Sequence, residues 1–236
     1  MIVHVYSIMR DEEDLVPYFL RHYSTFADTI FILDDHSTDK TVEIAKAHRK
    51  VRLLDFNYKG GLDEAEHSAC FEESYKKYSR GRADWVICVD ADEFIYHEDI
   101  VEVLEAQRKA GRKVIKATGY NMYAEVFPTT TGQIYEECYM GQRTTLYDKK
   151  IIFDPALDVK LEMGRHHTTL PEGIDYYRAK ILLLHYRYLS KDFILERFSR
   201  PPPGGMSERK WAWKLTVALK RHEQAIKGGS EFIKVL

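Results

Sequence analysis

The stretch from Trp85 to Phe94 reads WVICVDADEF, an apolar run that ends in two aspartates separated by one small residue. Side chains alternate between the faces of an extended strand, so Asp90 and Asp92 point the same way and Ala91 points to the opposite face. Two neighbouring carboxylates favour a divalent cation, and oxygen ligands favour Mg²⁺ or Mn²⁺, whose open positions phosphate oxygens usually fill. We therefore expect a site for a metal-bound diphosphate where this strand ends.

Strand-like and helix-like segments alternate through the first part of the chain. A strand that is apolar throughout is typical of a parallel sheet covered by helices on both faces. The predicted fold class is therefore α/β, with a mostly parallel sheet flanked by helices. The predicted strands are 1–8, 29–33, 51–56 and 85–89, and the predicted helices lie around 15–20, 42–45 and 62–78.

The second half continues this pattern with longer polar connections. Ser190 can cap a helix that runs through Phe198, and the sequence PPPGG at 201–205 breaks the chain before a last helix at 207–226. We expect a C-terminal helical appendage after one α/β domain. The other predictions are a helix at 100–110, one long strand at 113–123, strands at 143–147, 150–153 and 181–188, and loops at 125–139 and 154–175.

Composition excludes several classes of protein. The 236 residues are 44% hydrophobic, and 35 basic residues oppose 37 acidic ones, so no global basic charge would attract nucleic acid. Three cysteines without a CxxC pair argue against a disulfide framework and favour a reducing, cytoplasmic compartment. The N-terminus lacks the pattern of a signal peptide, and no apolar run is long enough to cross a bilayer. We expect a soluble cytoplasmic protein.

Known phosphate-binding motifs are missing from the sequence, but a second acidic stretch is present. There is no GxGxxG and no GxxxxGK[ST], which argues against Rossmann dehydrogenases and P-loop proteins. DDHSTD at 34–39 follows the second predicted strand, as the aspartates follow the fourth, and ligands of open α/β sheets bind at the carboxyl ends of strands. We assign Asp34 or Asp35 to ligand, and Ser37 and Asp39 to helix capping. The alternative is that both acidic stretches only cap helices.

Three motifs in this order resemble the family 2 glycosyltransferases and their relatives of GT-A fold. They are IMRDEE at 8–13, DDHSTDKT at 34–41 and ADWVICVDADEF at 83–94, with Asp11 where this family usually has Asn. The resemblance implies a GT-A-like domain at 1–200, with a nucleotide-binding half at 1–96 and an acceptor half at 97–200, followed by a linker and helix at 201–236. It also implies a nucleotide-sugar donor, a UDP-sugar above others. The implied donor-binding residues are Ile8, Arg10, Glu12, Asp34, Asp35, Gly61, Asp90, Ala91 and Asp92.

The resemblance also implies a late metal ligand and an acceptor side. His185 ends an apolar run and would complete a Mn²⁺ or Mg²⁺ site with Asp90 and Asp92, although a histidine in this position can equally be a core residue. His166 and His167 would line the acceptor side or lie on an exposed loop. Gly61 would let the backbone approach the donor, or would simply form a turn that starts a helix.

The expected reaction is metal-dependent transfer of the sugar to a hydroxyl group of a saccharide or glycolipid, with inversion, as in assembly of bacterial surface polysaccharide or glycolipid. Inversion needs a general base, and Asp158 and Glu162 are the candidates by their order in the chain. Retention is the alternative, but the sequence offers no clear nucleophile for it.

Other functions stay open at this point. A phosphatase resembling haloacid dehalogenases also places DxD after an apolar strand, but it favours Thr or Val where this chain has Phe94. A domain that binds a nucleotide sugar without turning it over is a third possibility. The last helix, which carries Trp211 and Lys214, packs on the core by default and could instead contact a membrane surface.

Overall fold

A six-stranded sheet forms the centre of the protein, in the order β3-β2-β1-β4-β9-β6. The computed structural model describes residues 1–56, 64–162, 165–202, 206–228 and 233–236. The first four strands of the sheet are parallel, and β9 runs antiparallel to both of its neighbours. The strands are β1 (Val3–Met9), β2 (Thr29–Asp34), β3 (Val51–Leu54), β4 (Trp85–Cys88), β6 (Val114–Ile115) and β9 (Ile152–Phe153).

Helices cover both faces of this sheet because side chains alternate along its buried strands. In β1, Val5 belongs to the core formed with α1, whereas Tyr6 belongs to the core formed with α3. Pro17 lies in the first turn of α1, where the missing amide hydrogen costs no helical hydrogen bond. The helices of this part are α1 (Val16–Tyr23), α2 (Thr41–Ala47), α3 (Glu64–Tyr78) and α4 (Ile100–Lys109).

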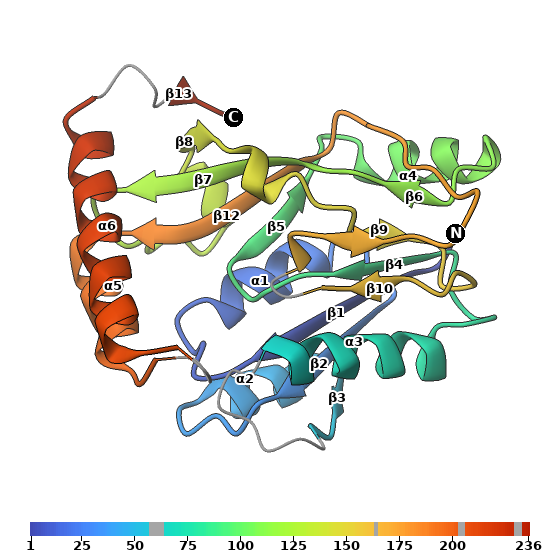
Figure 1. Ribbon diagram of the computed structural model, residues 1–236, viewed down its shortest axis with the longest axis horizontal. Helices are drawn as coiled ribbons and strands as arrows, with labels where there is room; N and C mark the ends of the chain where they lie inside the picture. The colour runs from blue at the N-terminus through green and yellow to red at the C-terminus, as the bar shows by residue number, and fades with distance from the viewer. Residues whose placement is uncertain (57–63, 163–164, 203–205, 229–232) are drawn as a thin grey trace.

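A second, five-stranded sheet in the order β13-β8-β7-β12-β5 is built mainly from the second half of the chain (Figure 1). In this sheet, β12 runs parallel to β7 and antiparallel to β5. β5 follows the two aspartates directly, so the acidic turn joins the two sheets. The strands are β5 (Glu93–Tyr96), β7 (Thr118–Ala124), β8 (Met140–Arg143), β12 (Leu182–Leu189) and β13 (Ile233–Lys234), and β10 (Lys160–Leu161) pairs with β11 (Thr168–Thr169) as a separate ribbon.

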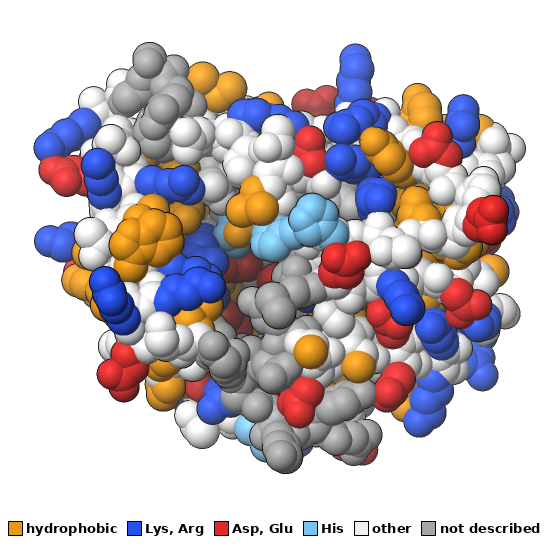
Figure 2. Space-filling model, viewed as in Figure 1, with side chains coloured by type: hydrophobic (Ala, Val, Ile, Leu, Met, Phe, Trp, Pro, Cys, Tyr) orange, Lys and Arg blue, Asp and Glu red, His pale blue; other side chains and the backbone are white. Residues whose placement is uncertain are grey.

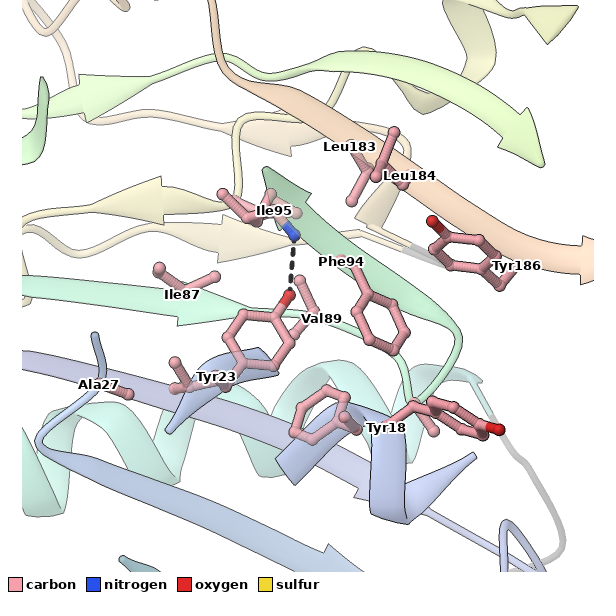
Figure 3. Packing of buried hydrophobic residues seen from close by; sticks show 14 of the residues in the cluster. Tyr18, Tyr23, Ala27, Ile87, Val89, Phe94, Ile95, Leu183, Leu184 and Tyr186 are labelled. Atoms are coloured by element: carbon pink, nitrogen blue, oxygen red, sulfur yellow. Dashed lines mark hydrogen bonds between the residues drawn. The ribbon is translucent and has the colours of Figure 1, made fainter. Parts of the chain in front are cut away.

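The junction between the sheets is held by α1. Tyr23 of α1 is fully buried, donates its hydroxyl hydrogen to the Glu93 carbonyl at 2.8 Å, and accepts from the Ile95 amide at 3.1 Å. Phe94 and Tyr186 pack edge to face beside it, with ring centroids 5.1 Å apart (Figure 3). The acidic turn therefore rests on a rigid, apolar layer.

The C-terminal helices lie beside the second sheet (Figure 1). Ser190 caps α5 (Lys191–Ser199), and Ser207 caps α6 (Glu208–Ile226), each by accepting a hydrogen bond from a backbone amide three residues on. α6 packs its Ala218 side against Tyr123, Tyr188 and Ile194. Within the described residues, no helix is both long and apolar enough to span a membrane.

The predicted fold class is confirmed, with local corrections. The loop predicted at 154–175 contains β10 and β11, which pair as an antiparallel ribbon. The strand predicted at 113–123 is two strands, because β6 pairs with β9 in the first sheet and β7 pairs in the second. The strand predicted at 143–147 ends at Arg143, and Thr145–Tyr147 forms a 3₁₀ turn whose backbone lies against Gly119. Periodicity did not predict β5, because its four residues follow a polar turn. The domain boundaries stay a prediction.

Candidate functional site

The carboxyl ends of β1 and β4 open into a cleft of about 370 Å³. Figure 2 shows a hollow in the middle of this face, with acidic side chains at its floor, histidine on its rim and Lys or Arg at its side. The placement follows from topology, since the carboxyl ends of parallel strands meet at one edge. Chemistry-bearing residues of the lining are Arg10, Asp11, Glu12, His67, Asp90, Asp92, Tyr147, Lys149, Arg165, His166, His185, Arg187, Arg197, Arg200 and Lys214.

Asp92 faces His185 across the cleft, with 3.5 Å between Oδ2 and Nε2. Asn121 Oδ1 accepts a hydrogen bond from His185 Nδ1 at 2.9 Å, so Nε2 is the ring nitrogen directed at the carboxylate. Burial alone would raise the pKa of Asp92, but His185 and Arg197 outweigh it and hold that pKa well below its ordinary value. Asp92 is therefore ionised at neutral pH, and a cation or a proton must separate the two facing acceptors.

Asp90 occupies a different environment, although it points into the same cleft. Its carboxylate forms an ion pair with Arg165, and the Asp90 side chain is 40% exposed. Burial raises its pKa, but Arg165 and Lys149 act more strongly and lower it. Below the turn, Glu93 accepts from the Asp90 amide at 3.3 Å and pairs with buried Lys149 at 2.5 Å. This buried pair fixes the conformation of the acidic turn.

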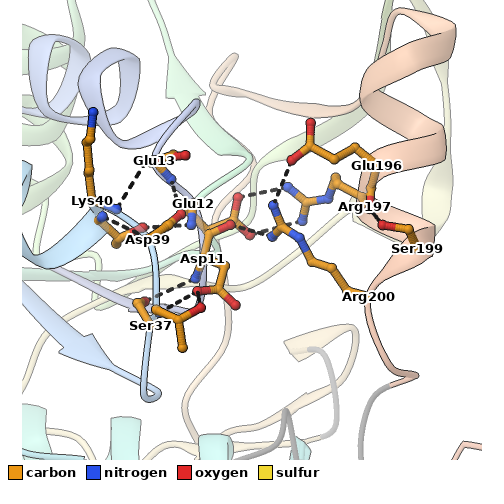
Figure 4. Close-up of polar contacts among 12 residues, drawn as sticks. Asp11, Glu12, Glu13, Ser37, Asp39, Lys40, Glu196, Arg197, Ser199 and Arg200 are labelled. Carbon is orange, nitrogen blue, oxygen red and sulfur yellow. Dashed lines mark hydrogen bonds and ion pairs between the residues drawn. The ribbon is translucent and has the colours of Figure 1, made fainter.

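The loop after β1 is fixed by the loop after β2 (Figure 4). The backbone amides of Asp11, Glu12 and Glu13 donate to the side chains of Ser37, Thr41 and Asp39 at 3.0, 2.7 and 2.9 Å, respectively. In return, the Thr38 amide donates to Asp11 at 2.6 Å and the Lys40 amide donates to Glu13 at 3.1 Å. Ser37 and Asp39, which the sequence predicted as helix caps, thus connect the two loops.

Glu12 and Arg197 connect this loop to α5. Arg197 donates to the two Glu12 oxygens at 2.8 and 3.1 Å (Figure 4). The same guanidinium lies 3.5 Å from Asp92. The neighbouring Arg200 donates to the Asp11 carbonyl oxygen. The sequence motifs did not indicate Arg165 or Arg197, since neither residue lies in one. The close spacing of Arg197 and Arg200 after β12 is a signal for Arg197, but no comparable signal marks Arg165.

The two acids at 34 and 35 have separate roles. Asp34 accepts from the Ser37 amide at 3.2 Å within its own turn, while fully buried Asp35 has Arg10, His36 and His67 within 3.8 Å. Among the described lining residues, the cleft is reached by Arg10 and His67 rather than by either acid. Asp39 accepts from the Thr41 amide at 2.8 Å at the start of α2, as expected, whereas Ser37 holds Asp11 instead of capping the helix.

The candidate general bases do not reach the cleft in the described structure. Asp158 is 72% exposed and pairs with Arg80 at 2.8 Å and Lys76 at 3.6 Å. Glu162 accepts from the Thr169 hydroxyl at 2.9 Å on the surface ribbon. Asp158 and Glu162 were chosen because they follow the acidic turn in the sequence. Order in the chain does not determine how far a side chain lies from the cleft in space.

The acceptor-side prediction separates two neighbouring histidines. His166 lines the cleft, its Nδ1 donates to the Leu146 carbonyl at 3.0 Å, and burial lowers its pKa to about 4. His167 is exposed and does not line the cleft as described. Gly61 lies outside the described residues, so its predicted role stays a prediction.

A divalent metal fits one part of this site. Asp92 and His185 supply an oxygen and an imidazole nitrogen that face each other, which suits Mn²⁺ or Mg²⁺ with further positions left for ligand oxygens. No group of three or more His, Cys, Asp or Glu residues suited to a metal ion occurs in the described part of the chain. The remaining positions would be filled by the bound substrate, by water or by Asp90, which lines the same cleft.

Fold and site together define an α/β protein with an acidic turn and several arginines around one open cleft. A family model described as glycosyl transferase family 2 matches residues 12–158, which is more than half of the chain. The chain belongs to this family. A search among curated proteins found no match.

Three of the solved structures to which this chain is similar are the following. S. aureus TarS is 14% identical over 94% of this chain, with a TM-score of 0.48, and this chain spans 43% of the TarS chain. TarS residues 1–349 with UDP-GlcNAc give 14% identity, coverage of 94% of this chain and 72% of that one, and a TM-score of 0.47. Mycobacterium tuberculosis glucosyl-3-phosphoglycerate synthase with Mn²⁺, UDP and phosphoglyceric acid is 21% identical, with a TM-score of 0.36. That match covers 51% of this chain and 43% of the synthase chain.

Proposed function

We propose that this chain is a metal-dependent glycosyltransferase that moves a sugar from a nucleoside-diphosphate donor, a UDP-sugar above others, to a hydroxyl acceptor with inversion. The observation that carries the proposal is the Asp92–His185 pair, in which the turn after β4 meets β12. The pair lies in the same cleft as the loop after β1. Membership of family 2 supports the reaction class.

The residues of the cleft match the charge that develops during this reaction. The departing nucleoside diphosphate gains negative charge as its bond to the sugar breaks, and a bound Mn²⁺ or Mg²⁺ would offset that charge as a Lewis acid. Asp92 and His185 would hold the ion. Arg197 and Arg200 lie on the same wall and place positive charge along the path of the diphosphate.

On the acceptor side, His166 is the group best placed to accept a hydrogen bond from the incoming hydroxyl. Its imidazole is uncharged above about pH 5, since burial lowers its pKa to about 4. Asp158 and Glu162 would have to move to serve as general base, because each is engaged with surface partners. We therefore look for the general base among the residues that line the cleft.

Nucleotide binding tests this proposal. UDP-, GDP-, CMP- and dTDP-sugars would be screened by thermal unfolding and by slow donor hydrolysis, with and without Mn²⁺, in the parent protein, Asp92→Ala and the control Asp158→Asn. We expect one donor to stabilise the parent and the control only with the metal, and Asp92→Ala to lose this effect. Donor binding without hydrolysis or transfer would favour a non-catalytic domain, and hydrolysis of simple phosphoesters without donor binding would favour a phosphatase.

We further propose that the protein acts at the cytoplasmic face of a membrane, on a saccharide or glycolipid acceptor, as in surface polysaccharide or glycolipid assembly. α6 buries Ala218 and His222 against the fold but leaves Trp213 62% exposed, together with exposed Arg209 and Lys220. A basic helix with an exposed Trp suits an anionic bilayer surface. In sedimentation with phosphatidylglycerol vesicles, the parent protein should pellet with the vesicles and Trp213→Ser should stay in the supernatant. Equal binding of the two proteins would show that α6 is not the membrane contact.

A further inference from the structure

Each aspartate of the acidic turn lies beside an arginine, but the two arginines are held differently. Arg197 is anchored by both carboxylate oxygens of Glu12, so its approach to Asp92 at 3.5 Å is secondary. Arg165 pairs with Asp90 as its ion-pair partner within the described residues. Arg165 is 3% exposed, yet its buried Nε has no hydrogen-bond partner in the described structure.

The conformation of Arg165 adds a second unusual feature. Its backbone φ is +54°, which is uncommon for a residue with a side chain, and its guanidinium lies 4.8 Å from the centre of the Phe71 ring. A buried donor without a partner costs free energy, and so does a left-handed backbone at a non-glycine residue. The fold therefore keeps a strained, incompletely satisfied arginine on the wall of the cleft.

Arg165 engages one oxygen of Asp90 and offsets the charge of that carboxylate, so it competes with a metal ion for Asp90. A guanidinium offers a planar set of N–H donors that matches the oxygens of a phosphate as well as those of a carboxylate. When a diphosphate enters the cleft, it offers Arg165 a new anionic partner and leaves the Asp90 oxygens open to a cation. The diphosphate draws Arg165 away from Asp90 and so favours the metal, and the metal draws Asp90 away from Arg165 and so favours the diphosphate.

Resting on the function proposed above, we infer that Arg165 is a ligand of the donor diphosphate that pairs with Asp90 until the donor binds. The exchange of partners makes metal and diphosphate bind cooperatively. Since such coupling is reciprocal, diphosphate strengthens metal binding by the same factor as metal strengthens diphosphate binding. A purely structural Arg165 would instead weaken both ligands or neither.

Titration calorimetry with Mn²⁺ alone, UDP alone and UDP in saturating Mn²⁺ tests this inference. In Arg165→Met, we expect Mn²⁺ alone to bind several-fold more tightly and UDP alone to bind about ten-fold more weakly, because the competing cation and the phosphate ligand are lost together. In Asp90→Asn, UDP alone should bind more tightly than in the parent, and the gain on adding Mn²⁺ should shrink.

Matched variants separate this role from folding. Arg80→Met removes an arginine from the exposed Asp158 pair and should leave all three titrations as in the parent. Arg165→Lys keeps the charge without the planar set of donors and, with Asp90→Asn, carries the test if Arg165→Met does not fold. Circular dichroism and thermal unfolding report the folded state of each variant.

The outcomes distinguish this inference from the function it rests on. The exchange of partners is overturned if Arg165→Met binds Mn²⁺ no more tightly than the parent, or if Asp90→Asn binds UDP without metal no more tightly than the parent. In either case, metal-dependent UDP binding by the parent still supports the transferase. A parent protein that binds neither UDP nor GDP at any Mn²⁺ concentration overturns both.

Discussion

The two walls of the cleft are built by different means. The loop after β1, residues 10–13, is held by backbone amides that donate to side chains of the loop after β2. The cleft arginines, which we call the arginine wall (Arg165, Arg187, Arg197 and Arg200), are held mainly by ion pairs and carbonyl contacts, two of them to the loop after β1. Backbone hydrogen bonds fix one geometry, whereas ion pairs exchange partners when a new anion arrives. The first wall positions a ligand, and the second responds to it.

The largest effect should come from breaking the link between the walls. Arg197→Met leaves half-buried Glu12 without its bidentate partner, and removing one partner of such a pair costs up to about 3–5 kcal/mol of unfolding free energy, less where the raised pKa of Glu12 lets it take up a proton. Urea denaturation would measure this loss.

The double variant Glu12→Gln/Arg197→Met is the control for that prediction. It removes both charges and should recover a large part of the stability, since no buried charge is left unpaired. If the single and double variants are equally unstable, Arg197 acts through packing rather than through the ion pair.

The second effect concerns pH and the apolar layer under the acidic turn. His22 is buried, and burial lowers its pKa from 6.5 to about 4. As pH falls from 6.5 to 4, the unfolded chain takes up a proton that the folded chain does not, so stability falls by about 1.4 kcal/mol per pH unit, roughly 3 kcal/mol in all. Above pH 6.5 this contribution is complete and constant.

Denaturant unfolding at several pH values checks the sign and size of this dependence. His22→Asn should flatten the part of the curve between pH 6.5 and 4, even though it loses stability overall because His22 Nε2 no longer reaches the Ile95 carbonyl. A parent curve that is flat across this interval would contradict the assignment of a neutral, buried His22.

The third effect is on the hydrogen-bonded wall. Thr41 is fully buried and accepts from the Glu12 amide at 2.7 Å, so Thr41→Val leaves that amide without a partner and should cost about 1–3 kcal/mol. Affinity for the donor should fall with it, because Glu12 and Arg197 shift together. Thr38→Val, on the exposed side of the same loop, is the control and should change both quantities little.

The smallest effect is expected far from the cleft. Arg80→Met breaks an exposed ion pair with Asp158, and solvent screens such pairs. The midpoint of thermal unfolding and the rate of sugar transfer should both stay close to those of the parent. A large loss of sugar transfer in Arg80→Met or Asp158→Asn would show that Asp158 takes part in the reaction, and would contradict its assignment to the surface.

Local pattern predicted the elements that depend on local chemistry. Strands that are apolar throughout, a proline in the first turn of α1 and serines at the starts of α5 and α6 are encoded within a few residues, and the structure has each of them. The position of the acidic turn was predicted correctly, but β4 ends at Cys88 and Asp92 lies in a turn, so strand alternation is not the reason that Asp90 and Asp92 reach the same cleft. Prediction failed at 113–123, where one β-forming run supplies strands to two different sheets.

The amino-acid sequence by itself determined the α/β class, the family, and the end of the sheet where the acids gather. The tertiary structure alone decided which charges meet them, placing Arg165 and Arg197 beside Asp90 and Asp92 and leaving Asp158 on the surface with Arg80. The physical reason is range: strand alternation and helix capping act over a few residues, whereas ion pairs depend on distances in space between segments that chain order does not fix.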